Sequence, residues 1–345
     1  MRTLIYILLT VCSSSLFAQQ AAPNNTSNTG KYVLAIHGGA GTLNKSQFTP
    51  ALEAKYKSGL DSALLVGNAI LEKGGTALDA VEATVKVLEN NPLFNAGKGA
   101  VFTNEGVNEL DAAIMDGKTL AAGSIAGVRT IKNPITAARA VMEKSDHVML
   151  SGKGAEQFAK QQKLELVDNS YFNTEFRYEA LQRAKQALAP QPHQAAVPYD
   201  PAWKMGTVGA VAIDRKGNLA AATSTGGMTA KRYGRIGDAP IIGAGNFADN
   251  TSCAVSATGH GEFFIRYQVA SDICARVKYQ GISAAKAADQ VIQQELAKVG
   301  GTGGVILIDH KGDVSWSFNT EGMYRAKKTE TGSTITQIFK DSPAQ

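Results

Sequence analysis

A glycine and a threonine, Gly206 and Thr207, stand between a proline-rich polar stretch and a run of small and apolar residues over 208–213. The run is typical of a strand, and the pair opens it. A threonine hydroxyl is a weak nucleophile near neutral pH, and a free α-amine beside it is a recognised general base. Cleavage of the bond before Thr207 would place its amine next to its own hydroxyl. This position therefore indicates a nucleophile that is activated by cutting the chain.

The composition allows one large domain or two smaller ones. The chain has 345 residues, of which 44% are hydrophobic, enough for a sizeable core. Lys and Arg number 35 against 30 Asp and Glu, a net charge of +5, and they form no basic runs. This pattern does not indicate a nucleic-acid-binding surface. The five histidines lie far apart without metal-ligand spacing, which favours structural or surface roles for them.

The first 18 residues have the pattern of a secretory signal peptide. Arg2 supplies the positive start, residues 4–11 the apolar stretch, and a small-residue segment ends at Ala18. A polar lead-in follows over 19–30. Since no later apolar run approaches the roughly 18 residues that a membrane helix needs, we expect an exported protein without a membrane span, periplasmic or secreted.

Three cysteines are present, and removal of the signal peptide would remove Cys12. A lipid anchor at Cys12 is the alternative, although the residues before it match that signal poorly. Cys253 lies in an expected strand and Cys274 in an expected helix, without metal-type spacing. An oxidising compartment would permit a disulfide, but two positions do not reveal a pairing. We expect two buried free thiols.

Periodicity predicts sheets covered by helices. Helices are expected over 58–73, 76–89, 134–144, 154–163, 262–278 and 283–298. Strands are expected over 31–36, 107–115, 207–213, 219–225, 252–257, 304–309 and 313–318. Along the chain, helices come first, strands lie in the middle, and helices and then strands follow. This order fits sheets covered by helices better than a nucleotide-binding fold.

The periodicity fades over 164–205, where four prolines and several glutamines predict a loop longer than compact domains normally hold. We interpret its end, about 186–206, as a flexible tether. The two strands after it are separated by a turn at 214–218. A hairpin of this kind would place Thr207 and Thr225 side by side.

Two familiar motifs are suggested near the start of the chain but lack their partners. The segment 37–41, His-Gly-Gly-Ala-Gly, could be an esterase oxyanion loop, yet no Gly-x-Ser-x-Gly supplies a nucleophile. Its glycines also lack the Gly-x-Gly-x-x-Gly register of a dinucleotide turn. Both classes are therefore disfavoured.

Arg235 and Asp238 lie three residues apart in a glycine-framed loop. An exposed charge pair of this kind contributes little to stability. A guanidinium, however, binds a carboxylate through two parallel hydrogen bonds. The two residues could instead hold the carboxylate and the ammonium of one amino acid.

From about Tyr32 to about Tyr324 the chain resembles the plant-type asparaginase and isoaspartyl peptidase family of N-terminal-nucleophile hydrolases. The segments that carry the resemblance are 37–41, 95–99, 206–211, 222–227 and 235–238, together with Thr258-Gly259 ahead of Gly261-Glu262. The resemblance implies an α+β fold, a four-layer αββα sandwich in one domain. It also implies self-cleavage between Gly206 and Thr207 into an α subunit, 31–206, and a β subunit, 207–345. Two such pairs would form a dimer of heterodimers.

The resemblance further implies a role for each matching residue. Thr207 would be the nucleophile, Thr225 its hydroxyl partner, and Thr258 with Gly259 the oxyanion hole. The implied substrate-binding residues are Arg235, Asp238, Thr258, Gly259, Asn95 and Gly39, with Arg235 and Asp238 on the α-carboxylate and α-amine. The implied reaction releases aspartate from L-asparagine or β-aspartyl dipeptides through a β-aspartyl ester.

The resemblance implies no cofactor for catalysis and a structural sodium ion. Main-chain carbonyls would hold the ion near Leu88, Glu89, Asn91, Phe94 and Ala96. Two alternative functions stay open. A glycosylasparaginase-like amidase shares the fold but usually carries Asp where this chain has Gly206, and a non-catalytic exported protein could bind an amino acid through Arg235 and Asp238.

Overall fold

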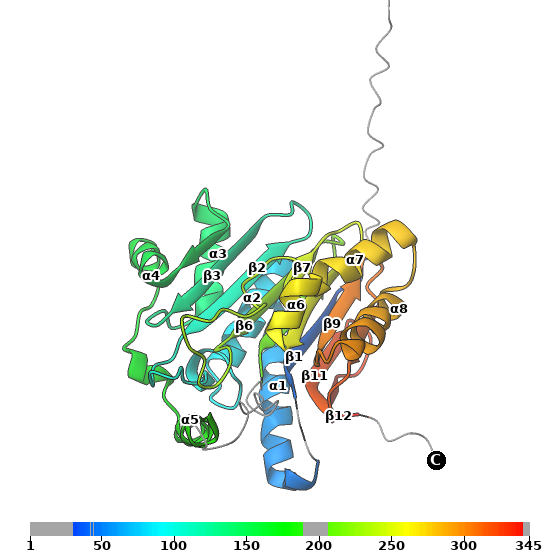
Figure 1. Ribbon diagram of the computed structural model, residues 1–345. Helices are drawn as coiled ribbons and strands as arrows, with labels where there is room; N and C mark the ends of the chain where they lie inside the picture. Colours follow the sequence, from blue (N-terminus) through cyan, green and yellow to red (C-terminus); the bar gives the residue numbers. More distant parts are fainter. Residues whose placement is uncertain (1–29, 42, 44, 189–205, 341–345) are drawn as a thin grey trace, which may run out of the picture.

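The computed structural model describes residues 30–41, 43, 45–188 and 206–340 (Figure 1). The expected signal peptide, residues 19–29 of the lead-in and residues 189–205 of the expected tether lie outside this part of the chain. Two β-sheets pack face to face, and helices cover the outer side of each. The four-layer αββα sandwich predicted from the sequence is confirmed.

The larger sheet has eight strands in the order β12-β11-β1-β5-β6-β2-β3-β4. They are β1 (Val33–Gly41), β2 (Leu110–Asp116), β3 (Ala122–Val128), β4 (Met149–Ser151), β5 (Val208–Ile213), β6 (Leu219–Thr225), β11 (Gly322–Thr329) and β12 (Ile335–Phe339). The smaller sheet has the order β10-β9-β8-β7. Its strands are β7 (Asn246–Ala248), β8 (Cys253–Gly259), β9 (Gly303–Asp309) and β10 (Val314–Phe318).

Helices α1 (Pro50–Glu72), α2 (Ala77–Glu89) and α3 (Pro134–Lys144) cover the larger sheet. Thr49 and Thr76 begin the first two, because each hydroxyl accepts a hydrogen bond from a backbone N–H of the first turn. The other helices are α4 (Gly152–Gln161), α5 (Glu175–Leu188), α6 (Gly261–Tyr267), α7 (Val269–Gln280) and α8 (Ala284–Asp289), with a π-helical turn, η5 (Gln290–Leu296). Short 3₁₀ turns occupy Lys45–Gln47, Gly97–Gly99 and Asn169–Phe172.

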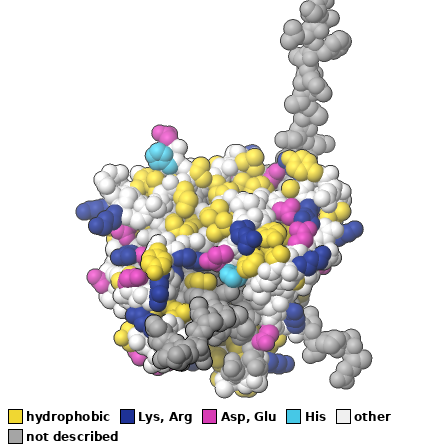
Figure 2. Space-filling model, viewed as in Figure 1, with side chains coloured by type: hydrophobic (Ala, Val, Ile, Leu, Met, Phe, Trp, Pro, Cys, Tyr) yellow, Lys and Arg dark blue, Asp and Glu magenta, His cyan; other side chains and the backbone are white. Residues whose placement is uncertain are grey.

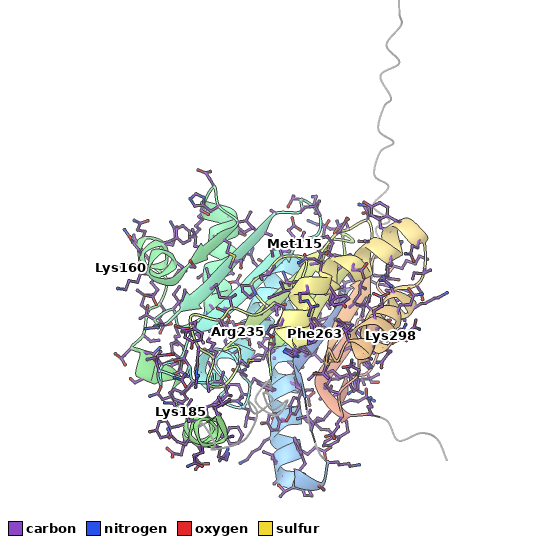
Figure 3. The ribbon with its side chains drawn as sticks, viewed as in Figure 1. Met115, Lys160, Lys185, Arg235, Phe263 and Lys298 are labelled. Carbon is purple, nitrogen blue, oxygen red and sulfur yellow. A yellow bond between two sulfur atoms is a disulfide. The ribbon has the colours of Figure 1, made fainter. Side chains whose placement is uncertain are left out.

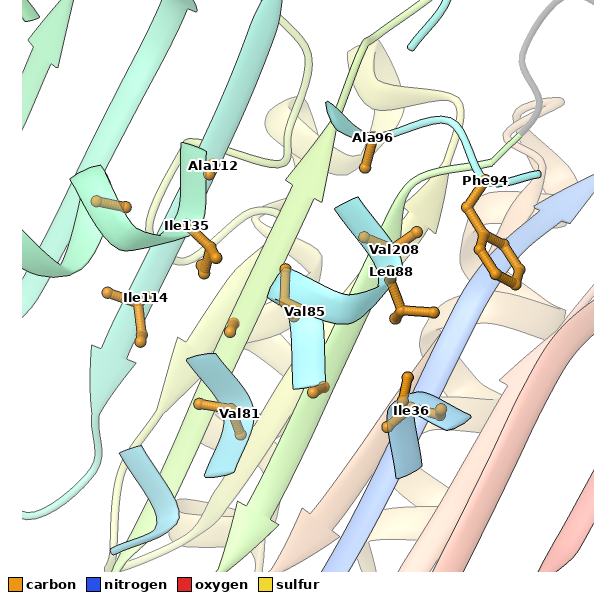
Figure 4. Close-up of a cluster of buried hydrophobic side chains, with 14 of the residues drawn as sticks. Ile36, Val81, Val85, Leu88, Phe94, Ala96, Ala112, Ile114, Ile135 and Val208 are labelled. Atoms are coloured by element: carbon orange, nitrogen blue, oxygen red, sulfur yellow. The ribbon is translucent and has the colours of Figure 1, made fainter. Parts of the chain in front are cut away.

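The main core lies between these first helices and the larger sheet. Val81, Val85 and Leu88 of α2 project onto Ile36 of β1 and Val208 of β5, and all five are buried (Figure 4). Burial of such a side chain contributes roughly 1.5–3 kcal/mol. The packing of α2 across β5 therefore holds the strand that follows Thr207.

A second core fills the space between the two sheets. Val211 and Ile213 of β5 face Ala254 of β8 and Ile306 of β9 there. Alternate residues of a strand share one face, so Thr207 and residue 209 lie on the same side as Val211. The candidate nucleophile thus lies at one end of the space between the sheets.

Several sequence-based expectations for the elements are corrected. α1 begins eight residues earlier than position 58, and the helix expected over 262–278 is divided at Gln268, whose φ is 49°. The helix expected over 283–298 continues from α8 as a π-helical turn. Strands β3, β4, β7, β11 and β12 were not anticipated.

The prediction of a loop over 164–205 is wrong for the middle of this range, because α5 occupies residues 175–188. Its buried stripe is narrow and includes a charged residue: Arg177, Leu181 and Ala184. A sequence search for apolar periodicity misses such a helix. The expected tether can therefore begin only after Leu188.

The expectation of two free thiols is also wrong. Cys253 at the start of β8 and Cys274 in α7 form a disulfide, with their Cα atoms 5.3 Å apart. Both residues are buried. The strand places Cys253 on the face that packs against α7, and this proximity could not be read from residues 21 positions apart.

Candidate active site

Thr207 and Thr225 lie side by side across the β5–β6 hairpin, as the sequence predicted. The hydroxyl of Thr207 donates a hydrogen bond of 3.1 Å to Oγ1 of Thr225. The same oxygen accepts a second hydrogen bond, of 3.0 Å, from the backbone N–H of Gly227. Only 8% of Thr207 and 3% of Thr225 are exposed. The hydroxyl of Thr207 therefore has a fixed neighbour in a buried site.

Two glycines from distant segments meet beside the hydroxyl pair. Gly39, near the end of β1, has a φ of 114°, and Gly206 has a φ of 103°. A Cβ on Gly39 would overlap the Cα of Gly206. The pairing of β1 with β11 shifts register between His37 and Gly39, which bends the strand at this point. Only glycine allows the two backbones to approach this closely.

Asn95 supports the loop that follows Thr225. Its Nδ2 donates to the carbonyl of Gly227 at 2.8 Å, and its Oδ1 accepts from the N–H of Val101 at 3.0 Å. Its own carbonyl accepts from Gly226 N at 3.0 Å. Asn95 thus fixes the backbone whose N–H reaches the Thr225 hydroxyl.

Thr258 and Gly259 end strand β8 of the smaller sheet. The buried hydroxyl of Thr258 accepts a hydrogen bond of 3.2 Å from Ala40 N, so it connects β8 to the glycine-rich end of β1. Gly259 follows with a φ of 149° and borders the same small cavity as Thr207. The cavity is lined by Thr207, Thr225, Gly227, Met228, Arg235, Gly237, Asp238 and Gly259. The structure thus gathers predicted residues from both sheets at one point.

Arg235 lies at this cavity and contacts α6 (Figure 3). Its Nε and Nη2 donate to Oε1 and Oε2 of Glu262 at 2.9 and 3.0 Å. A Cβ on Gly237 would lie 2.8 Å from the third nitrogen, Nη1. The pairing with Glu262 was missed by sequence reasoning, although Glu262 belongs to the segment that carried the resemblance.

Asp238 is almost fully buried, and its Oδ2 has no hydrogen-bond partner among the residues that the structure describes. Burial raises the pKa of this carboxyl to about 7, and the charge of Arg235 opposes the shift. A buried acceptor without a partner is costly. A ligand with an ammonium group would supply the missing partner in this cavity.

A further charged group was missed from the sequence. Asp111 pairs in register with Thr225 across β2 and β6, and its Oδ1 accepts from Gly127 N at 2.8 Å. The buried Nζ of Lys231 donates to the carbonyl of Glu109 at 3.3 Å. Burial raises the pKa of Asp111, and Lys231 and Arg235 lower it. These charges lie behind Thr225 and contribute to the field at the site.

Backbone carbonyls of the segment that follows α2 lie close to the Gly97–Gly99 turn. A Cβ on Gly97 would overlap the carbonyl oxygen of Glu89, and one on Gly99 would overlap that of Phe94 and lie 2.6 Å from that of Pro92. Carbonyl oxygens are the kind of ligand that a hard cation prefers, and these three lie close to the turn. Within the described ranges, His, Cys, Asp and Glu form no cluster of three or more that could hold a metal ion.

Comparison with known proteins identifies the family. A family model described as asparaginase matches residues 30–338. The chain belongs to the asparaginase family. The isoaspartyl peptidase of Escherichia coli (strain K12) is similar to this asparaginase-family chain, with 50% identity covering 90% of this chain and 97% of the relative. A putative isoaspartyl peptidase/L-asparaginase of Dictyostelium discoideum is 49% identical, covering 86% of this chain and 92% of the relative. A probable isoaspartyl peptidase/L-asparaginase 2 of Arabidopsis thaliana is 40% identical, covering 88% of this chain and 97% of the relative.

This asparaginase-family chain is therefore a hydrolase, as the sequence predicted. Among its described helices, none combines the length and apolar character needed to cross a membrane. Basic and acidic side chains are interspersed on the face shown in Figure 2, and hydrophobic side chains gather over the region of β2, β7 and α6.

Proposed function

We propose that this asparaginase-family chain releases aspartate from L-asparagine and from β-aspartyl dipeptides, with Thr207 as the nucleophile. The observation that carries the proposal is the Thr207–Thr225 hydroxyl pair, 3.1 Å apart at the rim of a cavity that also presents Arg235 and Asp238. The names of the similar proteins support this substrate class.

The nucleophile becomes available when the chain cuts itself between Gly206 and Thr207. The contact of Gly206 with Gly39 supports this step, because it holds the bond next to the Thr207 hydroxyl. The freed α-amine of Thr207 then acts as general base for its own hydroxyl. The products are an α subunit that ends at Gly206 and a β subunit, 207–345.

In turnover, Oγ1 of Thr207 attacks the side-chain carbonyl carbon of the substrate, and the amide bond breaks to release ammonia or the second amino acid. Thr258 and Gly259 stabilise the oxyanion, an effect often worth about 3 kcal/mol per donor. Thr225, fixed by Gly227 N, keeps the attacking hydroxyl oriented. Water then hydrolyses the β-aspartyl ester and regenerates the Thr207 hydroxyl.

Arg235 binds the substrate α-carboxylate and Asp238 the α-ammonium. The Nη1 of Arg235, adjacent to Gly237, supports this role, as does the unpartnered Oδ2 of Asp238. The two charges select an aspartyl group that carries both a free amine and a free carboxylate.

A structural sodium ion is part of the proposal, held by carbonyls of Leu88, Glu89, Asn91, Phe94 and Ala96. The close approach of the Glu89 carbonyl to Gly97 and of the Phe94 carbonyl to Gly99 supports it. Asn95 lies in this loop and contacts Gly226 and Gly227, so the ion would stabilise the support of Thr225. No cofactor takes part in catalysis.

Export and assembly also belong to the proposal. The disulfide between Cys253 and Cys274 supports an oxidising compartment, in accord with the pattern of residues 1–18. Two αβ pairs associate into a dimer of heterodimers, for which the apolar area on the face in Figure 2 offers a contact surface.

Turnover measurements test the proposal directly. Purified protein is supplied with L-asparagine, a β-aspartyl dipeptide, an α-aspartyl dipeptide and glycosylated asparagine. We expect release of aspartate from the first two alone. Preference for the glycosylated substrate would support the glycosylasparaginase-like alternative, and binding without turnover would support the amino-acid-binding alternative.

A further inference from the structure

A buried arginine of α5 has no part in the chemistry proposed above. Arg177 is 6% exposed, and its Nε donates to the carbonyl of Gly99 at 2.8 Å. Its Nη2 makes a longer contact, 3.5 Å, with the carbonyl oxygen of Leu93. Burial lowers the pKa of this guanidinium, and the neighbours that oppose the shift are the phenols of Tyr56 and Tyr324. A charge is costly to bury when carbonyls and phenols hold it instead of a carboxylate, which indicates a use beyond packing.

The two carbonyls that Arg177 contacts lie at opposite ends of one short segment, residues 93–99, which we call the 93–99 loop. A guanidinium is planar and presents its donors in a fixed geometry. Arg177 therefore sets the distance between the two ends of the loop. Neither carbonyl is among those proposed above for the sodium ion, so the ion and the guanidinium would hold different parts of the same loop.

The middle of the 93–99 loop contacts the glycines around the candidate nucleophile. A Cβ on Gly38 would lie 2.5 Å from the ring of Phe94, and one on Gly206 would lie 3.1 Å from Cβ of Asn95. Nδ2 of Asn95 donates to the carbonyl of Gly227 at 2.8 Å. The loop is therefore in contact with the residue before the nucleophile and with the backbone that supports the hydroxyl pair.

Helix α5 is itself fixed beside the substrate-binding loop. Leu181 and Ala184 are buried in a cluster with Phe102 and Ala230. The N–H of Ala230 also donates to the carbonyl of Phe102 at 2.9 Å. Because these contacts hold the helix in place, Arg177 has a fixed origin from which to hold the 93–99 loop.

We propose that Arg177 is a positioning residue for self-cleavage and for turnover, and that it acts by holding the two ends of the 93–99 loop. The proposal rests on the proposed function of Thr207. The loop places Asn95 against Gly206 before the chain is cut and holds Gly227 afterwards. Arg177 and the loop both belong to the α subunit, so the cut does not separate them. Precise placement of reacting groups is a large part of the rate that enzymes achieve.

Arg177→Met removes both contacts and leaves an apolar side chain that suits a buried helix position. We expect the rate of self-cleavage, and kcat on a β-aspartyl dipeptide counted per cut chain, each to fall about tenfold. KM should change less than about twofold, because Arg235 and Asp238 are untouched. Arg177→Lys should recover part of kcat, since an ammonium group can reach one carbonyl but cannot span both. Unchanged rates in Arg177→Met overturn the proposal. If the methionine variant does not fold, a wild-type kcat in Arg177→Lys overturns it.

Arg325→Met is the matched control. Arg325 on β11 is also buried, and its Nη1 also donates to two backbone carbonyls, those of Met323 at 3.0 Å and Phe339 at 3.3 Å. Neither carbonyl belongs to the 93–99 loop. We expect kcat of this variant to stay within about twofold of the wild type at a temperature at which circular dichroism shows the variants to be folded. An equal loss of kcat in Arg325→Met and Arg177→Met would attribute the effect to the removal of any buried arginine and overturn the proposal.

Hydrogen exchange measured by mass spectrometry follows the same coupling without turnover. In Arg177→Met we expect amide exchange to become about tenfold faster in peptides that cover 93–101 and 226–230, and to stay unchanged over 253–259 in β8. Unchanged exchange over 226–230 overturns the proposal. Absence of activity in the wild type would contradict the proposed function, while the exchange rates still decide whether Arg177 holds the 93–99 loop.

Discussion

Gly39 and Gly206 are in direct backbone contact, although one lies on β1 and the other immediately precedes the candidate nucleophile. A Cβ on Gly39 would overlap the Cα of Gly206. The contact determines where the bond before Thr207 lies, so a substitution at Gly39 tests whether that position matters for self-cleavage.

Gly39→Ala is expected to slow self-cleavage by about 100-fold, since a displacement of about 1 Å at a reacting group can have this effect. Gel electrophoresis over time measures the disappearance of the uncut chain. Gly74→Ala is the control, because Gly74 also has a positive φ, 79°, but no atom lies within 4 Å of the point that its Cβ would occupy. Equal slowing in both variants would attribute the effect to backbone strain alone.

Arg235→Ala is expected to raise KM for L-asparagine more than tenfold, because loss of one partner of a buried charged pair costs about 2–5 kcal/mol. Self-cleavage should be unaffected, because it involves no free amino acid. Lysine at this position should rescue poorly, since a single ammonium group cannot hold both oxygens of Glu262 and also reach the substrate carboxylate. Steady-state kinetics and gel electrophoresis measure the two properties.

Arg139→Ala is the matched control for Arg235. Its side chain is exposed to 18% against 19% for Arg235, and it is also held by carboxylates, on the outer helices. We expect its KM to equal that of the wild type. An unchanged KM in Arg235→Ala would place the substrate carboxylate elsewhere.

The pH dependence of kcat/KM should report Asp238. Its pKa is raised to about 7 by burial, and only the ionised carboxylate holds an ammonium group. We therefore expect kcat/KM to rise with pH through about 7, whereas kcat should rise less, because the bound ammonium lowers the pKa of Asp238. In Asp238→Asn this inflection should vanish. A second inflection, which comes from the α-amine of Thr207, should persist; the pKa of such an amine is about 7.7–8.0 in short peptides. An inflection near 7 that survives in Asp238→Asn would contradict the assignment.

Removal of the Cys253–Cys274 disulfide should lower the free energy of unfolding by about 2–4 kcal/mol. Urea denaturation of a Cys253→Ala, Cys274→Ala double variant measures the change. Wild-type protein denatured with a reductant should behave like the variant. Alkylation of both cysteines in denatured wild-type protein without reductant would show free thiols instead.

Local patterns in the sequence predicted the parts of the site that depend on a single hairpin. The two strand-like runs over 208–213 and 219–225, separated by a five-residue turn, were sufficient to place Thr207 beside Thr225. The glycines around Arg235 and Asp238 likewise indicated a binding loop, and both residues line the cavity. The resemblance to a family supplied the four layers.

Contacts between distant strands could not be predicted in this way. β11 returns beside β1 within the larger sheet, and the disulfide joins β8 to the helix α7 that packs on it; neither contact leaves a local pattern. A buried layer of polar side chains between the sheets consists of His37, Thr223, Asn246 and Ser256, each on a different strand. Each of these residues is ordinary alone, and only the packing of the sheets brings them together beneath Thr207.

The N-terminus of the smaller chain tests the central claim most directly. Purified wild-type protein should separate under denaturing conditions into two chains, of which the smaller begins Thr-Val-Gly-Ala by sequencing and mass. Thr207→Ala should fold but stay one chain without activity, because self-cleavage and substrate attack need the same oxygen. An intact wild-type chain with full activity, or hydrolysis of β-aspartyl dipeptides by Thr207→Ala, would contradict Thr207 as the self-released nucleophile.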